Sequence, residues 1–308
     1  MSLLVVGSVA LDDVETPFGS REDALGGAAV YFGLAASYFT DVRVVGVVGT
    51  DFPDEHVELL VSHGLDLSGL QTAEGRTFRW GGRYGFDFNA RETLYTDLNV
   101  FADFDPEIPD SFRDTDHVFL ANIDPGLQLR VLEQVAEPRT TSLDTMNYWI
   151  ENTPRKLREV IERVELVLIN DSEARELAEE PNLRLAGERI LSWGPRLVVV
   201  KKGEHGAITF GPDGRFAVPG LPLENIVDPT GAGDAFAGGF LGTLASLEDL
   251  TTEGLRRATI YGSAMGSFCC ESFSVDRLAS LSPRDIERRF LEFKELTHFD
   301  HVPLLLDA

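Results

Sequence analysis

The sequence predicts an α/β fold in which helices cover both faces of a mostly parallel central sheet. Two observations predict it: short runs rich in β-branched residues recur along the chain, and longer amphipathic stretches separate several of them. This alternation is typical of βαβ units. Strands are expected at 3–6, 42–48, 117–120, 164–169 and 197–200, and helices at 28–39, 53–63, 127–135, 154–163, 173–179, 185–192, 232–247, 252–268 and 283–296. No repeat or Pro/Gly-rich linker divides the chain, so residues 1–308 are expected to form one domain.

One segment departs from this rhythm and predicts a small β-lid. Aromatic side chains fall on even positions between 77 and 96, which is the period of a strand with one aromatic face; they are Phe78, Trp80, Tyr84, Phe86 and Phe88. The glycines at 81, 82 and 85 suggest a bend or bulge. We expect the lid at about 75–100, together with a strand near 12–19. The alternative is that the aromatic face covers the core or a subunit interface, and a homodimer sharing lids is expected on that ground.

The composition narrows the function to small-molecule chemistry. The chain holds 27 Lys and Arg against 51 Asp and Glu, a formal net charge of −24, and shows no local basic patch. Such a chain repels phosphate backbones and anionic lipid, which argues against nucleic-acid and membrane-surface binding. The two cysteines, Cys269 and Cys270, are neighbours, which excludes a disulfide framework and fits a cytoplasmic location. The N-terminal stretch lacks the features of a signal peptide.

The string from Asp228 to Asp234, which reads DPTGAGD, carries the most chemical information. Gly231 and Gly233 leave the backbone uncovered at a helix start, where amide N–H groups converge on an anion. A carboxylate in the first helical turn, Asp234, could then accept a proton from an alcohol while the amides hold a phosphoryl group. The alternative is an acid that stabilises the helix dipole. Neither G-x-G-x-x-G after the first strand nor G-x-x-x-x-G-K-[ST] occurs, which argues against a dinucleotide oxidoreductase and a P-loop kinase.

This string resembles the C-terminal signature of the PfkB or ribokinase-like family of carbohydrate and nucleoside kinases, and the resemblance covers nearly the whole chain. It implies a three-layer αβα sandwich of the ribokinase-like type. It also implies that Asp234 is the catalytic base and that the amides from Gly231 through Ala232 and Gly233 form the anion hole. Near the start, the family's substrate-binding acid corresponds to Asp12, with Asp13 as the fallback. The Gly-Gly turn that lines the sugar site corresponds to Gly26 and Gly27.

The resemblance also places the nucleotide and metal. The Asn-x-x-Glu element corresponds to Asn170 and Glu173, which would organise Mg²⁺ through water. The alternative from spacing alone is a helix cap. Further residues implied to bind the cofactor ATP are Thr230, Lys201, Gly203 and Gly206, together with Ser263 within an adenine segment at 259–266. Lys201 has a solvated strand end as its alternative. A monovalent cation, K⁺, is possible near 228–230.

The sequence says less about the molecule that would accept the phosphoryl group. Where many sugar kinases of this family carry Asn after the Gly-Gly turn, this chain has Ala28, Ala29 and Tyr31. Trp80 of the lid and Asn147, which follows Asp144 after a short strand, are candidate substrate contacts. We therefore expect an ATP-dependent kinase acting on the hydroxymethyl group of a sugar or sugar derivative. The alternatives are a nucleoside kinase, adenosine-like in its acceptor, and a sensor that binds without turnover. The tail at 298–308 is expected to pack on the fold or on a partner.

Overall fold

A nine-stranded sheet forms the centre of the computed structural model, which describes residues 1–247 and 250–300. Its order is β13-β12-β11-β10-β9-β8-β1-β4-β5. The strands are β1 (Ser2–Val6), β4 (Asp41–Gly49), β5 (Leu65–Ala73), β8 (His117–Leu120), β9 (Thr140–Leu143), β10 (Leu166–Asn170), β11 (Leu197–Lys201), β12 (Ala207–Gly211) and β13 (Gly214–Val218). Neighbours pair in parallel except β11 with β12 and β12 with β13. The predicted mostly parallel sheet is confirmed.

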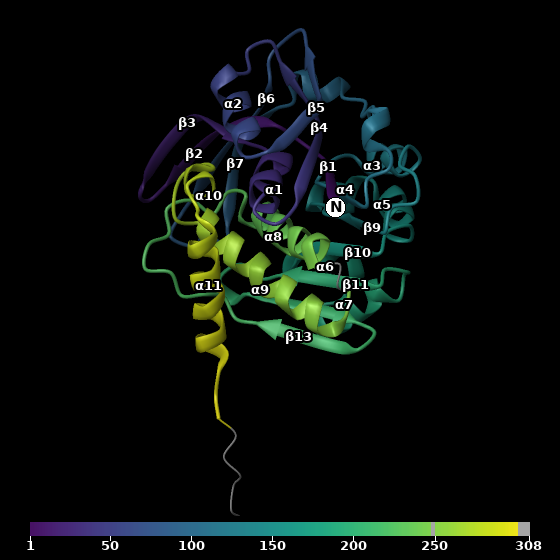
Figure 1. Cartoon of the computed structure of the whole chain (residues 1–308), viewed down its shortest axis with the longest axis vertical. Helices are drawn as coiled ribbons and strands as arrows, with labels where there is room; N and C mark the ends of the chain where they lie inside the picture. Colours follow the sequence, from purple (N-terminus) through teal and green to yellow (C-terminus); the bar gives the residue numbers. More distant parts are fainter. Residues whose placement is uncertain (248–249, 301–308) are drawn as a thin grey trace, which may run out of the picture.

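Helices cover both faces of this sheet, so the three-layer sandwich is confirmed (Figure 1). One layer holds α1 (Ala28–Ala36), α2 (Asp54–Ser62), α8 (Ala232–Leu247), α9 (Thr252–Cys269), α10 (Asp276–Ala279) and α11 (Pro283–Thr297). The other holds α3 (Pro125–Leu132), α4 (Asn147–Asn152), α5 (Pro154–Ile161), α6 (Asp171–Ala178) and α7 (Leu183–Leu191). Alternation within β1 sends Leu3 and Val5 into the first layer and Leu4 and Val6 into the second.

Small residues bring α1, α8 and α9 close together beneath the site. A Cβ on Gly238 of α8 would lie 2.3 Å from the carbonyl oxygen of Phe32, and one on Gly239 would lie 2.6 Å from Met265. Only glycine permits these approaches. The start of α8 is therefore held rigidly against two buried helices.

The predicted helices lie within a few residues of their observed ends, but α4, α10 and several strands were not predicted. The missed strands are β5, β12 and β13 at the two edges of the main sheet, and β3 (Gly19–Gly26). Edge strands are half exposed and carry mixed residues, so they lack the continuous apolar runs of the central strands. Of the tail at 298–308, which was expected to pack on the fold or on a partner, residues 301–308 lie outside the described residues, and Phe299 is exposed.

A second sheet of four strands forms the lid, at the upper left of Figure 1. Its order is β3-β2-β6-β7, with β2 (Ala10–Thr16), β6 (Phe78–Tyr84) and β7 (Arg91–Asp97). The predicted lid segments at 12–19 and 75–100 are thus found at 10–26 and 78–97, the first being longer because it forms a hairpin with β3. The predicted bulge is confirmed by a register shift between Gly81 and Gly82 against β7.

The aromatic stripe of the lid is shorter than predicted. Because β6 ends at Tyr84, Phe86 and Phe88 lie in the following loop, and Phe86 is 91% exposed. Alternation along β6 puts Trp80 and Tyr84 on one face. The opposite face is polar: Arg83 pairs with Glu15 at 2.7 Å and the hydroxyl of Tyr95 donates to Asp13.

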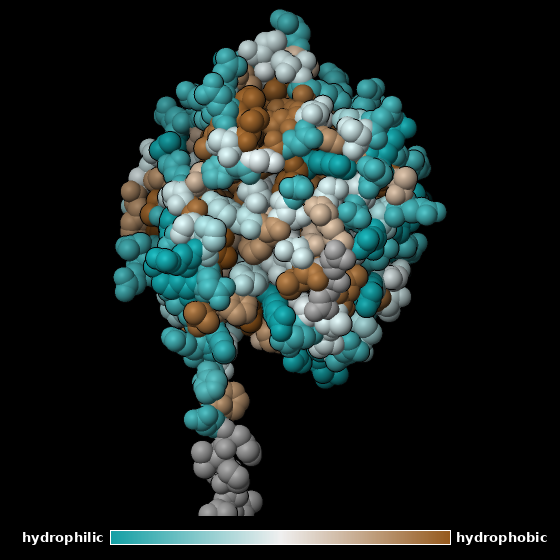
Figure 2. All heavy atoms as spheres, in the orientation of Figure 1, coloured by the Kyte–Doolittle hydropathy of each residue, from teal (hydrophilic) through white to brown (hydrophobic). Residues whose placement is uncertain are grey.

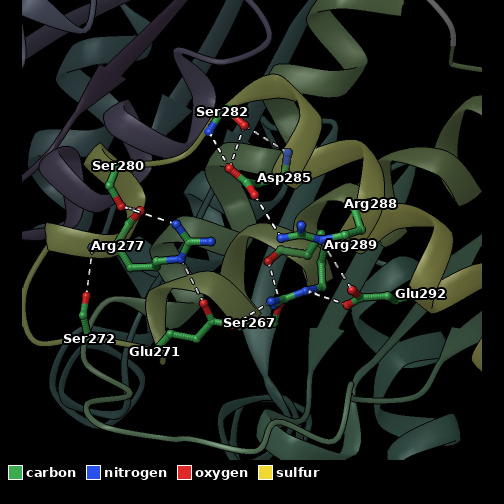
Figure 3. Close-up of polar contacts among 11 residues, drawn as sticks. Ser267, Glu271, Ser272, Arg277, Ser280, Ser282, Asp285, Arg288, Arg289 and Glu292 are labelled. Carbon is green, nitrogen blue, oxygen red and sulfur yellow. Dashed lines mark hydrogen bonds and ion pairs between the residues drawn. The ribbon is translucent and has the colours of Figure 1, made fainter.

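A network of ion pairs fixes the end of α9 to α10 and α11 (Figure 3). Glu271 accepts hydrogen bonds from Arg277 at 3.0 Å and from Arg289 at 2.5 Å. The preceding carbonyl, that of Cys270, accepts from the amide of Val227 at 2.8 Å. This network therefore anchors the segment that leads into the glycine-rich start of α8.

The surface agrees with the acidic composition. Figure 2 shows hydrophilic side chains over most of the face in view, with hydrophobic ones gathered mainly in its upper part. Among the residues that the structure describes, no helix has the length and apolar character required to cross a bilayer.

Candidate active site

The start of α8 carries the glycine-rich turn for which the sequence predicts an anion hole. Gly231 has φ +76°, and a Cβ there would lie 2.2 Å from the ring of Tyr31, so only glycine fits this position. The helix begins at Ala232, which leaves the amides of Gly233 and Asp234 in its first turn, where no intrahelical acceptor exists. These amides and the positive end of the helix dipole favour an anion at this point.

Asp234 lies in the same turn with a carboxylate suited to proton transfer. Burial and the charge of Asp144 raise its pKa to about 7, against the opposing charges of Lys201 and Arg91. The residue as a whole remains partly exposed, so an acceptor can reach it. A base whose pKa lies near neutrality is effective in general base catalysis.

Lys201 and Asp144 form an ion pair beside this turn. The ammonium of Lys201, at the end of β11, lies 2.6 Å from Asp144 Oδ2, and the two side chains are only 14% and 7% exposed. A Cβ on Gly233 would lie 3.2 Å from the Lys201 ammonium. The solvated strand end considered for Lys201 is therefore wrong: the cation lies against the glycine-rich turn.

Asn170 and Glu173 form a capping box at the start of α6. The Glu173 amide donates to Asn170 Oδ1 and the Asn170 amide donates to Glu173 Oε2, both at 2.8 Å. Burial and the charge of Asp144 raise the pKa of Glu173 to about 8, with Lys201 opposing. The helix-cap alternative is thus realised, and it aims one buried carboxylate at the same cluster as Asp144 and Asp234.

The donor set near this cluster fits a hydrated divalent cation. The charge of Asp144 acts on both Glu173 and Asp234, and the Lys201 ammonium interacts with all three carboxylates. Excess buried negative charge and oxygen donors suit Mg²⁺ that retains its waters. In the ranges 1–247 and 250–300, no three His, Cys, Asp or Glu side chains converge closely enough to bind a metal directly.

Asp12, the predicted substrate-binding acid, is buried beside the turn of Gly26 and Gly27. It is 4% exposed, and burial together with the charges of Asp228, Asp13 and Asp234 raises its pKa to about 8. A Cβ on Gly26 would lie 1.9 Å from Asp12 Oδ2, and Gly27 has φ +97° with a Cβ position 2.4 Å from the Ser8 carbonyl oxygen. A side chain at either position of the predicted turn would collide with these atoms, so both positions require glycine.

Asp13, the fallback for this role, faces away from the site. Its Oδ1 accepts from the Asp23 amide at 2.7 Å and its Oδ2 accepts from Tyr95. These partners belong to the polar outer face of the lid. Asp12, rather than Asp13, therefore stays the candidate for the predicted contact with the acceptor.

Aromatic side chains lie near the glycine-rich turn and near Asp12. Tyr31 is 2% exposed, and its ring lies under Gly231. The Tyr84 hydroxyl lies 3.3 Å from Thr230 Oγ1, and Trp80 pairs with Asp12 in the parallel register of β2 and β6. Thr230 is thus brought to the lid.

Other predicted residues lie at the edges of this site. Gly203 and Gly206 bound a 3₁₀ turn, Gly203–His205, in which both have positive φ. Asn147 donates to Glu176 of α6, and Ser263 donates to the Thr259 carbonyl at 2.9 Å. The last two contacts are with neighbouring helix residues rather than with the Asp234 cluster.

Sequence reasoning missed Arg91 and left Asp144 undecided. Arg91 begins β7, and its guanidinium lies 5.3 Å from the centre of the Trp80 ring. It stands in a polar stretch without any motif, so only the pairing of β6 with β7 could have placed it.

A ribokinase-like sandwich with this constellation defines a phosphotransferase that uses an alcohol group as acceptor. The chain belongs to the pfkB family of carbohydrate kinases, whose family model matches residues 6–280.

Two curated relatives match most of the chain. The cytidine kinase of Thermococcus kodakarensis is 35% identical over 267 residues, which cover 84% of this chain and 95% of the relative. The ATP-dependent ribose-1-phosphate kinase of Halopiger xanaduensis is 29% identical over 264 residues, which cover 83% of each protein.

Solved structures share the fold. The nucleoside kinase of Burkholderia thailandensis in complex with inosine has a TM-score of 0.79 at 21% identity, covering 94% of this chain and 96% of the other. A ribokinase II from E. coli, in complex with ATP and Mg²⁺, has a TM-score of 0.77 at 18% identity, covering 94% and 99%.

Proposed function

We propose that this protein is an ATP-dependent nucleoside kinase that phosphorylates the hydroxymethyl group of the ribose. The observation that carries the proposal is the pairing of Asp12 with Trp80 across β2 and β6. It sets a carboxylate that can accept from ribose hydroxyls beside an aromatic plane on which a base can stack. The 35% identity with a cytidine kinase supports the same acceptor class. The nucleoside alternative is thus better supported than the sugar kinase we first expected.

The chemistry follows from the positions of the chain's own residues. Asp234 takes the proton of the acceptor hydroxyl as its oxygen bonds to the γ-phosphorus and the bond to the leaving ADP oxygen breaks. The amides of Gly231, Gly233 and Asp234 surround the phosphoryl oxygens as their charge develops. The Ala232 amide, which the sequence also placed in the anion hole, instead donates to the Pro229 carbonyl at 3.1 Å. Lys201 lies next to this turn and adds positive charge.

The cofactors in the proposal are ATP and Mg²⁺. Asn170 and Glu173 would hold Mg²⁺ through water, and the metal would neutralise phosphate charge. Gly203, Gly206, Thr230 and Ser263 are proposed to border the nucleotide. K⁺ is proposed near 228–230, where Asp228 is 1% exposed and has a raised pKa because it is buried.

A sugar derivative is the second candidate acceptor. The match to a ribose-1-phosphate kinase favours it, since that relative acts on a pentose without a base. Asn147 is proposed as a substrate contact under either reading.

The setting is proposed to be the cytoplasm, where the thiols of Cys269 and Cys270 stay reduced, as they are in the structure. A homodimer through the lid is proposed to form along the exposed loop of Phe86 and the neighbouring Phe18, which is 63% exposed. Sedimentation of the purified protein tests this state.

ADP release with Mg²⁺ and ATP tests the proposed acceptor. The panel contains cytidine, uridine, adenosine, inosine, ribose, fructose and ribose 1-phosphate, each run with the wild type and with Asp234→Asn. Nucleoside-dependent turnover that the variant lacks supports the proposal. Turnover only with the free sugar or sugar phosphate assigns the second candidate, and no acceptor-dependent turnover leaves a binding protein without catalysis.

A further inference from the structure

Gln128 is a fully buried polar side chain outside the Asp234 cluster. It lies on α3, which begins soon after β8 ends, and its exposed fraction is 0%. Its side-chain amide donates to the carbonyl oxygens of Ala121 at 3.0 Å, Asp144 at 3.1 Å and Leu120 at 3.4 Å. Its other polar atom, Oε1, has no hydrogen-bond partner among the described residues. The side chain of Gln128 therefore acts in this structure as a donor alone.

These carbonyl groups lie at the ends of two neighbouring strands. Leu120 is the last residue of β8 and Ala121 follows it, whereas Asp144 follows Leu143, the last residue of β9. The pairing of β9 with β8 and with β10 extends no further than Leu143. The Gln128 amide thus ties the two chain segments together where the regular pairing of the strands ends.

The carboxylate of Asp144 holds the Lys201 ammonium. Oδ2 of Asp144 lies 2.6 Å from Lys201 Nζ, and Oδ1 accepts from the Thr145 amide at 2.7 Å. The ammonium in turn lies 3.2 Å from the Cβ position of Gly233, in the glycine-rich turn of α8. Direct contacts therefore connect Gln128 through Asp144 to Lys201 and to that turn.

Burial makes the position of this ion pair depend on the Gln128 amide. Buried carbonyl groups that lose their donor cost free energy, so the chain after β9 would shift to recover hydrogen bonds. The Lys201 ammonium is also attracted by the carboxylates of Glu173 and Asp234. A fixed Asp144 therefore decides where the ammonium rests among these three carboxylates.

We propose that Gln128 is a positioning residue for phosphoryl transfer: its amide fixes the chain after β9 so that Asp144 holds the Lys201 ammonium against the glycine-rich turn of α8. The proposal rests on the proposed kinase function, in which this ammonium adds positive charge beside the phosphoryl group. Because it is fully buried, Gln128 itself touches neither nucleotide nor acceptor. Its effect reaches the reaction only through the ion pair.

The rate at which acetic anhydride acetylates Lys201 tests the position of the ammonium without any turnover. Mass spectrometry can follow every lysine of the chain, since there are only Lys156, Lys201, Lys202 and Lys294. Lys201 should react slowly in the wild type relative to the exposed Lys156, because its side chain is 14% exposed and ion-paired. Gln128→Met, which keeps the length of the side chain but lacks the donor, should raise this rate several-fold. Asp144→Asn should raise it by a similar factor.

Gln134→Met is the matched control. The side-chain amide of Gln134, just past the end of α3, donates to the carbonyls of Pro106 at 2.8 Å and Arg130 at 3.1 Å. Its Oε1 accepts from the Ile108 amide at 2.9 Å. The substitution thus removes comparable hydrogen bonds away from the ends of β8 and β9. It should lower Tm and leave both kcat and the acetylation rate of Lys201 at their wild-type values.

Steady-state kinetics tests the route to the reaction. Gln128→Met should lower kcat about 10- to 10²-fold with little change in the KM for the acceptor, because a displaced cation weakens the transition state. Lys201→Met should lower kcat at least as much, and adding Gln128→Met to it should have little further effect. Gln128→Asn keeps the amide on a shorter side chain, so it should show the same changes in smaller degree, and it replaces Gln128→Met if that variant does not fold.

Three results would each overturn the positioning role in an active enzyme. They are an unchanged kcat in folded Gln128→Met, losses of kcat that multiply in the double variant with Lys201→Met, and a Lys201 acetylation rate equal to that of the wild type. If the wild type phosphorylates a sugar and no nucleoside, the same ratios are measured with that sugar. If the wild type shows no acceptor-dependent turnover, the proposed function fails and the role of Gln128 in it fails with it.

Discussion

Lys201 and Asp144 are joined at 2.6 Å and act on Asp234 in opposite directions. The carboxylate of Asp144 raises the pKa of Asp234, whereas the ammonium of Lys201 lowers it. Because both partners are largely buried, solvent screens these effects little. The pair therefore sets the pH at which the proposed base becomes available.

The first prediction concerns Asp234 itself. With its pKa at about 7, kcat/KM of the wild type should rise tenfold per pH unit below 7 and level off above it, because the base must be deprotonated. Above this pKa, Asp234→Asn should lower kcat about 10²–10⁴-fold. Circular dichroism is the control for folding, and near-normal turnover in this variant would contradict the assignment.

The second prediction concerns the ion pair. Asp144→Asn removes a charge that raises the Asp234 pKa, so the ascending limb of the pH profile should move to lower pH. Lys201→Met removes a charge that lowers it, so the limb should move to higher pH. The single Lys201→Met variant also leaves Asp144 buried and unpaired, at a cost of about 3–5 kcal/mol in stability. The double variant restores that balance, and a profile that moves the same way in both single variants would sink this account.

The third prediction links Asp12 to stability. Its folded pKa of about 8 exceeds the value in the unfolded chain, so folding favours the protonated form and stability declines as pH rises from about 4 to about 8. Asp12→Asn removes this cost and should stabilise the fold by about 1–3 kcal/mol at pH 8.5 while leaving it nearly unchanged at pH 4. Urea unfolding at the two pH values measures the difference. Acceptor KM should rise in the same variant.

The fourth prediction concerns lid docking. Asn89→Ala removes the contact with Glu204 and should lower kcat about tenfold while the ratio of ATP hydrolysis to acceptor phosphorylation rises, because the lid excludes water. Asn152→Ala, which removes an exposed amide contact within α4, is the control. An unchanged ratio in Asn89→Ala would show that docking at this tip is not needed.

The fifth prediction separates backbone strain from collision. Gly64 has φ +79° with open space around it, whereas Gly231 has φ +76° with the Tyr31 ring 2.2 Å from the Cβ position. Gly64→Ala should cost about 1 kcal/mol, from strain alone. Gly231→Ala should cost more and abolish turnover, and equal losses of Tm in the two variants would count against the tight packing of Tyr31.

The central strands and most helices could be predicted from the sequence because buried segments show a regular hydrophobic pattern. Both faces of β1, β8, β10 and β11 are covered, so these strands are continuous apolar runs. β3 was missed because its first five residues are exposed and include Arg21, Glu22 and Asp23. Its pairing partner, and not its own pattern, makes it a strand.

Candidate site residues could be proposed from the sequence where they lie in one short motif, but not where they come together only through long-range pairing. Gly231 and Asp234 are three residues apart, so their motif can be recognised from the sequence alone. Lys201 meets Asp144 across 57 positions, and Arg91 reaches Asp234 only because β7 pairs with β6. No local sequence pattern predicts such contacts between residues far apart in the chain.

The lid sheet is assembled from two stretches, 10–26 and 78–97, that meet through the parallel pairing of β2 with β6. Between them the chain builds α1, β4, α2 and β5 of the main sheet. Closing so long a loop is entropically costly until the intervening core has formed. The lid therefore cannot be removed or transferred to another enzyme as one continuous segment. During refolding, its amides should be among the last to gain protection from hydrogen exchange.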